Sequence, residues 1–143
     1  MQSLPITQEQ IQIVRTSFEK VAASRLPTGK LFYDRLFELA PQTKALFVNT
    51  EIEAQGDKLV RMIGVAVGAL SQPDALIPVL VGLGERHLNY GVTDEMYNPG
   101  GEALIWTLRY VLGAEFTKEV QEAWLSVYSL MVQVILDAAH QAQ

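Results

Sequence analysis

The feature that most restricts the fold of this chain is a run of apolar residues spaced alternately four and three positions apart. In the middle of the sequence this run includes a histidine, and its members are Leu76, Leu80, Leu83, His87 and Tyr90. This spacing places side chains on one face of an α-helix. No segment alternates apolar and polar residues for more than a few positions, as a half-buried β-strand would. The sequence therefore predicts an all-α fold of about seven helices.

Start and stop signals divide the chain into these helices. Residues 7–10 have the form of a capping box, and Pro27 suits the first turn of a second helix that ends at Pro41. Pro78 predicts an irregular start or a kink in the helix that carries the histidine. The Asn-Pro-Gly-Gly segment at 98–101 indicates a turn, although its proline also suits a helix start. The remaining helices are predicted over Ile52–Leu70, from the end of a break at residues 71–74 to Gly91, over Ala103–Leu112 and from Glu115 to about Ala139.

Length and composition favour one domain over residues 1–143. Hydrophobic residues make up 49% of the chain, which is enough to fill a core, and charged residues only 19%. A net charge of −5 without a basic run makes nucleic acid an unexpected partner, because phosphate neutralisation needs clustered Lys and Arg. The absence of cysteine excludes disulfides, zinc ribbons, iron–sulfur clusters and thiol catalysis.

The sequence also favours a soluble, cytoplasmic protein without a membrane partner. The N-terminus has no basic patch followed by an apolar stretch, so we expect no signal peptide. The longest uncharged apolar runs, 62–70 and 75–84, are shorter than the ~20 residues that span a bilayer.

A single histidine on an apolar helix face has three chemical uses: a hydrogen-bonded core group, a general base, or the one protein ligand of a metal-bearing cofactor. Taken alone, His87 favours the core group, because a bare metal site would need further ligands. The other histidine, His140, lies in a polar tail and is expected to face solvent.

Five patches, in this order and spacing, resemble the globins, in particular the single-domain bacterial branch related to flavohaemoglobins. The patches are Tyr33 eight residues before Pro41, Phe47 six residues after Pro41, Gln55-Gly56-Asp57-Lys58-Leu59, the segment from Leu83 to Val92 around His87, and Ala123-Trp124 with Tyr128. The resemblance spans nearly the whole chain. It implies a globin fold with a short or absent D helix and haem b (iron protoporphyrin IX) as the cofactor, with His87 as the metal ligand.

The residues themselves agree with a haem slot. Haem needs a flat apolar cleft between helices and one axial nitrogen. We expect Phe47, Leu59, Ile63, Leu83 and Val92 to line the porphyrin; ordinary core packing is the alternative for each.

A neutral imidazole that binds iron through one nitrogen donates its other N–H, and the backbone carbonyl of Leu83 is a candidate acceptor. In flavohaemoglobins a tyrosine and a glutamate polarise this histidine. Tyr97 resembles the tyrosine, whereas the glutamate position falls near Ala139, with Asp137 as the closest acid.

On the opposite side, the resemblance places Tyr33 and Gln55 next to the gas ligand. Both side chains are hydrogen-bond donors; a core tyrosine and a solvated glutamine are the alternatives. Lys58 is expected to pair with a haem propionate, or else, buried and neutral, to close the sixth iron position. Relatives carry a bulky apolar residue where this chain has Gly100, which predicts a void or channel in the ligand pocket unless a neighbour such as Trp106 covers it.

Three functions follow. The favoured one is a haem protein that binds oxygen, CO and NO reversibly and with high affinity. The second is a nitric oxide dioxygenase that uses Tyr33 and Gln55 catalytically and depends on an external reductase, since the sequence contains no reductase domain. The third is a haem-free globin-fold module for sensing or interaction. A monomer and a homodimer are both compatible with the sequence.

Overall fold

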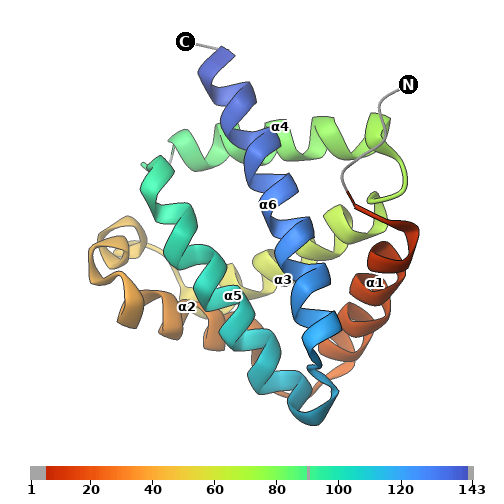
Figure 1. The fold of residues 1–143 in the computed structure, drawn as a ribbon. Helices are drawn as coiled ribbons and strands as arrows, with labels where there is room; N and C mark the ends of the chain where they lie inside the picture. Colours follow the sequence, from red (N-terminus) through yellow and green to blue (C-terminus); the bar gives the residue numbers. More distant parts are fainter. Residues whose placement is uncertain (1–5, 90, 142–143) are drawn as a thin grey trace.

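The computed structural model describes residues 6–89 and 91–141, and for residues 88, 89 and 139–141 it describes only the backbone. The predictions for Tyr90 and for the side chain of His140 therefore lie outside the described residues. Figure 1 shows the helices, which are α1 (Gln8–Ala23), α2 (Thr28–Leu39), η1 (Pro41–Phe47), α3 (Ile52–Gly68), α4 (Pro73–Asn89), η2 (Asp94–Met96), α5 (Tyr97–Leu112), η3 (Gly113–Glu115) and α6 (Lys118–Gln141).

The predicted all-α class is confirmed. The described residues contain no strand, and the six α-helices together with the seven-residue 3₁₀ helix η1 make up the predicted seven. Only residues 48–51 separate η1 from α3, so no D helix stands between them. The capping box is present: Thr7 Oγ1 accepts from the Gln10 backbone N–H at 3.0 Å, and the Gln10 side chain accepts from the Thr7 backbone N–H at 3.1 Å.

The core is organised around the contact between the first and last helices. The Trp124 side chain on α6 is fully buried, and its Nε1–H donates to Ser17 Oγ on α1 at 2.8 Å. Ser17 in turn donates to the backbone carbonyls of its own helix. This arrangement satisfies the indole N–H, which would otherwise be an unpaired polar group inside the core.

Two helix pairings place the predicted site. Helix α2 packs against α3 and α5, and α4 packs against α6, while α3 and α4 contact each other only slightly. Figure 1 shows α4 crossing near one end of α6 and α5 running beside α6. The helix that carries Gln55 and the helix that carries His87 are thus held by different neighbours.

Several helix boundaries differ from the predictions. The Asn-Pro-Gly-Gly segment forms the first turn of α5, where Pro99 is tolerated because the N–H groups of a first turn have no intrahelical acceptor. Helix α4 begins at Pro73, within the predicted break, and contains Pro78 as expected. Helix α3 ends at Gly68, and α6 begins at Lys118 because η3 occupies residues 113–115. Gly113 does end α5, with a φ of +57°.

No helix in the described part of the chain is both long enough and apolar enough to cross a bilayer.

Candidate functional site

His87 lies where the apolar stripe of α4 leaves the core. Leu76 and Leu80 are fully buried, whereas Leu83 and His87, one and two turns further on, are half-buried. The imidazole is therefore not enclosed like the leucines before it. The periodicity correctly gave the face of the helix, but it could not show that this face emerges from the core at its C-terminal end.

The end of α4 is held in place by a glycine turn. The backbone N–H of Val92 donates to the carbonyl of His87 at 2.9 Å, and Gly91 between them has a φ of +92°. This is the closing bond of a Schellman motif, whose left-handed position favours glycine. A Cβ added to Gly91 would lie 3.3 Å from Leu46 Cδ2. The turn after His87 thus lies against η1, the helix that ends with Phe47.

The His87 ring makes a hydrogen bond with a tyrosine. Its Nδ1 lies 3.2 Å from Tyr97 Oη, at the start of α5. The prediction that the Leu83 carbonyl accepts from this imidazole was wrong, because the tyrosine occupies the Nδ1 side. Among the described residues Nε2 has no hydrogen-bond partner. Burial, and next the charge of Arg86, lower the pKa of His87, so the ring is neutral near pH 7 and able to bind a metal ion.

Tyr97 is fixed from its other side by α6. Tyr128 Oη donates to the backbone carbonyl of Tyr97 at 2.6 Å. Burial, and next the charge of Asp94, raise the pKa of the Tyr97 phenol. The acid closest in sequence to the expected glutamate, Asp137, is exposed and accepts from Gln133 Nε2 at 2.8 Å. The structure therefore forms the histidine–tyrosine pair and leaves Asp137 out of it.

A second polar pair forms where α2 crosses α3. Gly29 and Gly56 meet at this crossing: a Cβ on Gly56 would lie 2.9 Å from the Gly29 carbonyl carbon, and a Cβ on Gly29 would collide with the Gly56 backbone. Only glycine allows the two backbones to approach this closely. Tyr33 is one turn after Gly29, and Gln55 directly precedes Gly56, so the crossing brings their side chains together.

The predicted gas-contacting residues are hydrogen-bonded to each other. Gln55 Nε2 donates to Tyr33 Oη at 3.3 Å. The Tyr33 side chain is 5% exposed, and its ring packs edge-on to Phe47 with centroids 5.1 Å apart. Burial raises the pKa of Tyr33, although its bond with Gln55 acts in the opposite direction. The phenol is therefore protonated at neutral pH and keeps an O–H to donate.

The expected porphyrin-lining side chains share one property, which is that all are half-buried. They are Phe47, Leu59, Ile63, Leu83 and Val92. Leu59 and Ile63 also line a small internal cavity of about 10 Å³ beside Phe32 and Trp124. These two residues therefore pack on the core from α3 and retain some exposed surface.

The structure corrects two further expectations. Lys58 is exposed, which contradicts the alternative that it is buried beside the iron. Gly100 faces α6: a Cβ there would lie 3.2 Å from Tyr128 Oη, so this glycine adjoins Tyr128 and not a void in the ligand pocket. Trp106, the neighbour suggested to cover it, lies instead beneath the Arg35 guanidinium, 5.3 Å from the ring centroid.

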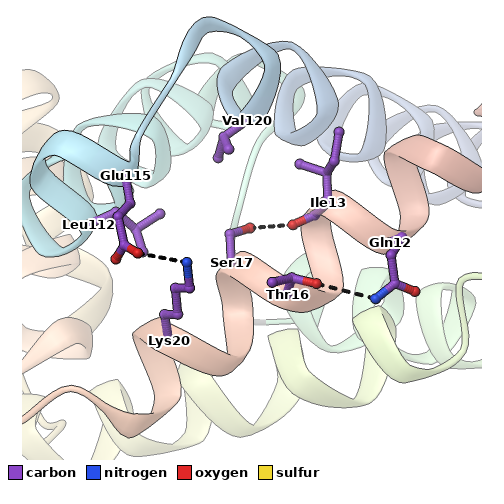
Figure 2. A pocket seen from close by; sticks show the side chains of 8 residues that line it. All are labelled: Gln12, Ile13, Thr16, Ser17, Lys20, Leu112, Glu115 and Val120. Atoms are coloured by element: carbon purple, nitrogen blue, oxygen red, sulfur yellow. Dashed lines mark hydrogen bonds and ion pairs between the residues drawn. The ribbon is translucent and has the colours of Figure 1, made fainter.

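A separate hollow of about 230 Å³ lies between α1 and the junction of α5 with α6. Figure 2 shows its polar rim, where Lys20 pairs with Glu115 at 2.7 Å across the opening. None of the predicted site residues lines this hollow. In the described part of the chain, no three His, Cys, Asp or Glu side chains gather in a way that could hold a bare metal ion.

Sequence reasoning missed the Gly29–Gly56 crossing and the bond from Tyr128 to the Tyr97 carbonyl. A signal for the crossing was present, since a glycine inside a helical pattern often marks a close approach of two backbones. No comparable signal marks the tyrosine bond, because its acceptor is a backbone carbonyl 31 residues away.

Comparison with known proteins identifies the family. The chain is 29% identical to the neuroglobin of Chaenocephalus aceratus and to neuroglobin-1 of Oncorhynchus mykiss, in each case over 89% of this chain and 88% of the relative. It is 27% identical to the flavohemoprotein of Vibrio cholerae, over 92% of this chain but only 34% of that longer protein. The globin family model matches residues 30–135, which include both polar pairs and Trp124. The chain belongs to the globin family.

Proposed function

We propose that this globin binds haem through His87 and reversibly takes up oxygen, CO and NO on the side that Tyr33 and Gln55 face. The observation that carries the proposal is the state of His87. It is a neutral, half-buried imidazole with Nδ1 bonded to Tyr97 and with Nε2 left without a partner among the described residues. Nε2 is not among the buried side-chain atoms without a partner in the described part of the chain, so this nitrogen is accessible from outside the core and open to a ligand.

The residues present fit haem. A flat apolar cofactor would cover the half-buried side chains of Phe47, Leu83 and Val92. The turn after α4 lies against Leu46 of η1, the residue before Phe47. Exposed Lys58, on the helix of Gln55, is available to pair with a propionate. The polar groups are few, as in most cofactor sites, where apolar walls hold the group and a small number of polar atoms orient it.

When bound, ferrous haem supplies an iron atom that takes up diatomic gases. The chain supplies the rest. Tyr97 holds the His87 ring in one orientation, and its bond with Nδ1 leaves Nε2 for the iron. Tyr33 has a free O–H, because its oxygen accepts from Gln55. Gln55 has a second amide hydrogen to donate.

These donors favour a bound ligand that carries negative charge over an uncharged one such as CO. A hydrogen bond to a charged acceptor contributes about 1.5–3 kcal/mol, roughly ten- to a hundred-fold in affinity. Two such donors predict slow oxygen release, with a smaller effect on CO. The low exposure of Tyr33 supports this, because water competes little with a buried donor.

The relatives support a haem function and are compatible with two activities, reversible gas binding and nitric oxide dioxygenation. Proteins named neuroglobin match over most of their length, and proteins named flavohemoprotein match over about a third of theirs. The second group favours a further candidate, a nitric oxide dioxygenase supplied with electrons by a separate reductase. The bacterial branch and the cytoplasmic location remain predictions from the sequence.

The test is a haem titration with visible spectra of the ferric, ferrous, CO-bound and oxygen-bound forms. The variant is His87→Ala, and the matched control is His140→Ala, since these are the only two histidines. We expect wild type and the control to bind one haem and to shift their spectra with CO and oxygen, and His87→Ala to lose the histidine-ligated spectrum. A wild-type chain that takes up no haem would contradict the proposal. Nitrate formation from NO with an added reductant distinguishes the enzyme from the binder.

A further inference from the structure

The outer face of α5 carries a hollow, and of the predicted site residues only Tyr97, the partner of His87, lies on its border. It measures about 700 Å³ and is bordered by α2, α5 and α6. Three turns of α5 contribute to it, through residues such as Glu102, Ile105, Trp106 and Arg109. Ile105 and Trp106 are half-buried, while Glu102 and Arg109 are exposed.

Exposed apolar and aromatic side chains continue around this hollow. Tyr110 is 56% exposed and stacks on Trp106 with ring centroids 5.4 Å apart, and Leu125 on α6 is 43% exposed at the rim. Tryptophan, tyrosine and arginine are the residues that most often contribute binding energy at protein interfaces. We call this face of α5, with Glu102, Ile105, Trp106, Arg109 and Tyr110, the α5 surface.

The charges on the α5 surface are arranged symmetrically. Glu102 lies three residues before Ile105, and Arg109 lies three residues after Trp106. The seven-residue separation of the two charges is close to two helical turns, so both point to the same side, each about 5 Å along the axis from the midpoint between 105 and 106. A twofold axis through that midpoint would place Glu102 of one α5 opposite Arg109 of an antiparallel copy, twice.

Both charged groups are available for such a contact. Among the described residues Glu102 has no ion pair or hydrogen bond through its side chain. Arg109 donates to Gln121 Oε1 at 3.1 Å and lies over the Phe116 ring at 5.4 Å, and it has no carboxylate partner within the described part of the chain. The other guanidinium at the hollow, Arg35, is held by Glu38 and by Trp106.

From this self-complementarity we propose that the α5 surface is the interface of a homodimer with twofold symmetry, in which Glu102 of each copy pairs with Arg109 of the other. A twofold contact uses the same patch on both partners, so every charge must find its opposite within the patch itself. The α5 surface meets this condition. Each chain has a net charge of −5, so two copies repel at long range, and the two local pairs fix where they meet.

The experiment measures the dimer dissociation constant of the haem-loaded protein by sedimentation equilibrium. The variants are Glu102→Arg, Arg109→Glu and the double charge exchange. We expect each single variant to raise the dimer dissociation constant at least about tenfold, because like charges then face each other at both of the symmetry-related contacts. We expect the double variant to restore the dissociation constant to within a few-fold of wild type.

Glu53→Arg on α3 is the matched control. It makes the same change in net charge at an exposed position that does not line the hollow, and we expect it to leave the dimer intact. Three results would overturn the proposal: a wild-type protein that stays monomeric to submillimolar concentration, a control that weakens the dimer as much as Glu102→Arg, or a double variant that fails to recover. Haem spectra and circular dichroism verify that each variant is folded, so that loss of the dimer is separable from loss of the haem site.

Discussion

The close crossing of α2 and α3 makes Gly29→Ala an informative perturbation. An added methyl group would collide with the Gly56 backbone, which cannot rotate away as a side chain can, so the two helices must separate. Overpacking of this kind costs about 1–3 kcal/mol. Alanine gains at most about 1 kcal/mol of helix propensity over glycine, and less in the first turn of α2. The steric term wins, and we expect a net loss of stability of about 1–2 kcal/mol from these two contributions.

The same displacement should reach the gas-contacting pair. The bond from Gln55 Nε2 to Tyr33 Oη is already 3.3 Å long, so a shift of a few tenths of an ångström carries it beyond hydrogen-bond distance. We therefore expect faster oxygen dissociation from the haem-loaded Gly29→Ala variant, with a smaller change for CO, which gains less from these donors.

Urea unfolding of the haem-free protein and stopped-flow gas release are the two assays. Gly68→Ala is the matched control, because Gly68 ends α3 and a Cβ there has no neighbouring atom within 4 Å. This control should be neutral or slightly stabilising and should leave oxygen release unchanged. If Gly29→Ala proves as stable as the control and releases oxygen at the wild-type rate, the glycine crossing does not position Tyr33 and Gln55.

Three further predictions follow from single contacts. Trp124→Phe should destabilise the protein by about 2–4 kcal/mol in urea unfolding, since it leaves a cavity and removes the bond to Ser17; a loss below ~1 kcal/mol would contradict this. Burial raises the pKa of both Tyr33 and Tyr128 above the ordinary value of about 10, so stability present below pH 10 is lost as the pH rises further. Tyr128→Phe should cost about 1 kcal/mol at pH 7 and show a shallower alkaline loss than wild type. Oxygen dissociation should change little between about pH 7 and 5, where an imidazole titrates, because Gln55 has no titratable nitrogen; a steep change would count against its contact with the ligand.

The helix positions and the identity of the buried faces were predictable from the sequence. These predictions depend only on neighbours within a few residues, where local backbone geometry determines the structure. Examples are the apolar spacing along α4 and α6, the capping box at Thr7 and the helix end at Gly113. The sequence left two alternatives for residues 98–101, because proline and glycine suit both a loop turn and the first turn of a helix. The structure has the helix start, where Gly100 and Gly101 pack against Tyr128.

The partners of the site residues were decided by tertiary structure. Spacing placed His87 on an inward face, but it could not choose between the Leu83 carbonyl and the Tyr97 hydroxyl, since that depends on how α5 begins beside the end of α4. It likewise placed Tyr33 and Gln55 on separate helices, and the Gly29–Gly56 contact brings them together. A residue's own helix fixes the direction of its side chain, whereas what the side chain meets depends on helices distant in sequence, whose approach is set by side-chain volumes at the crossing.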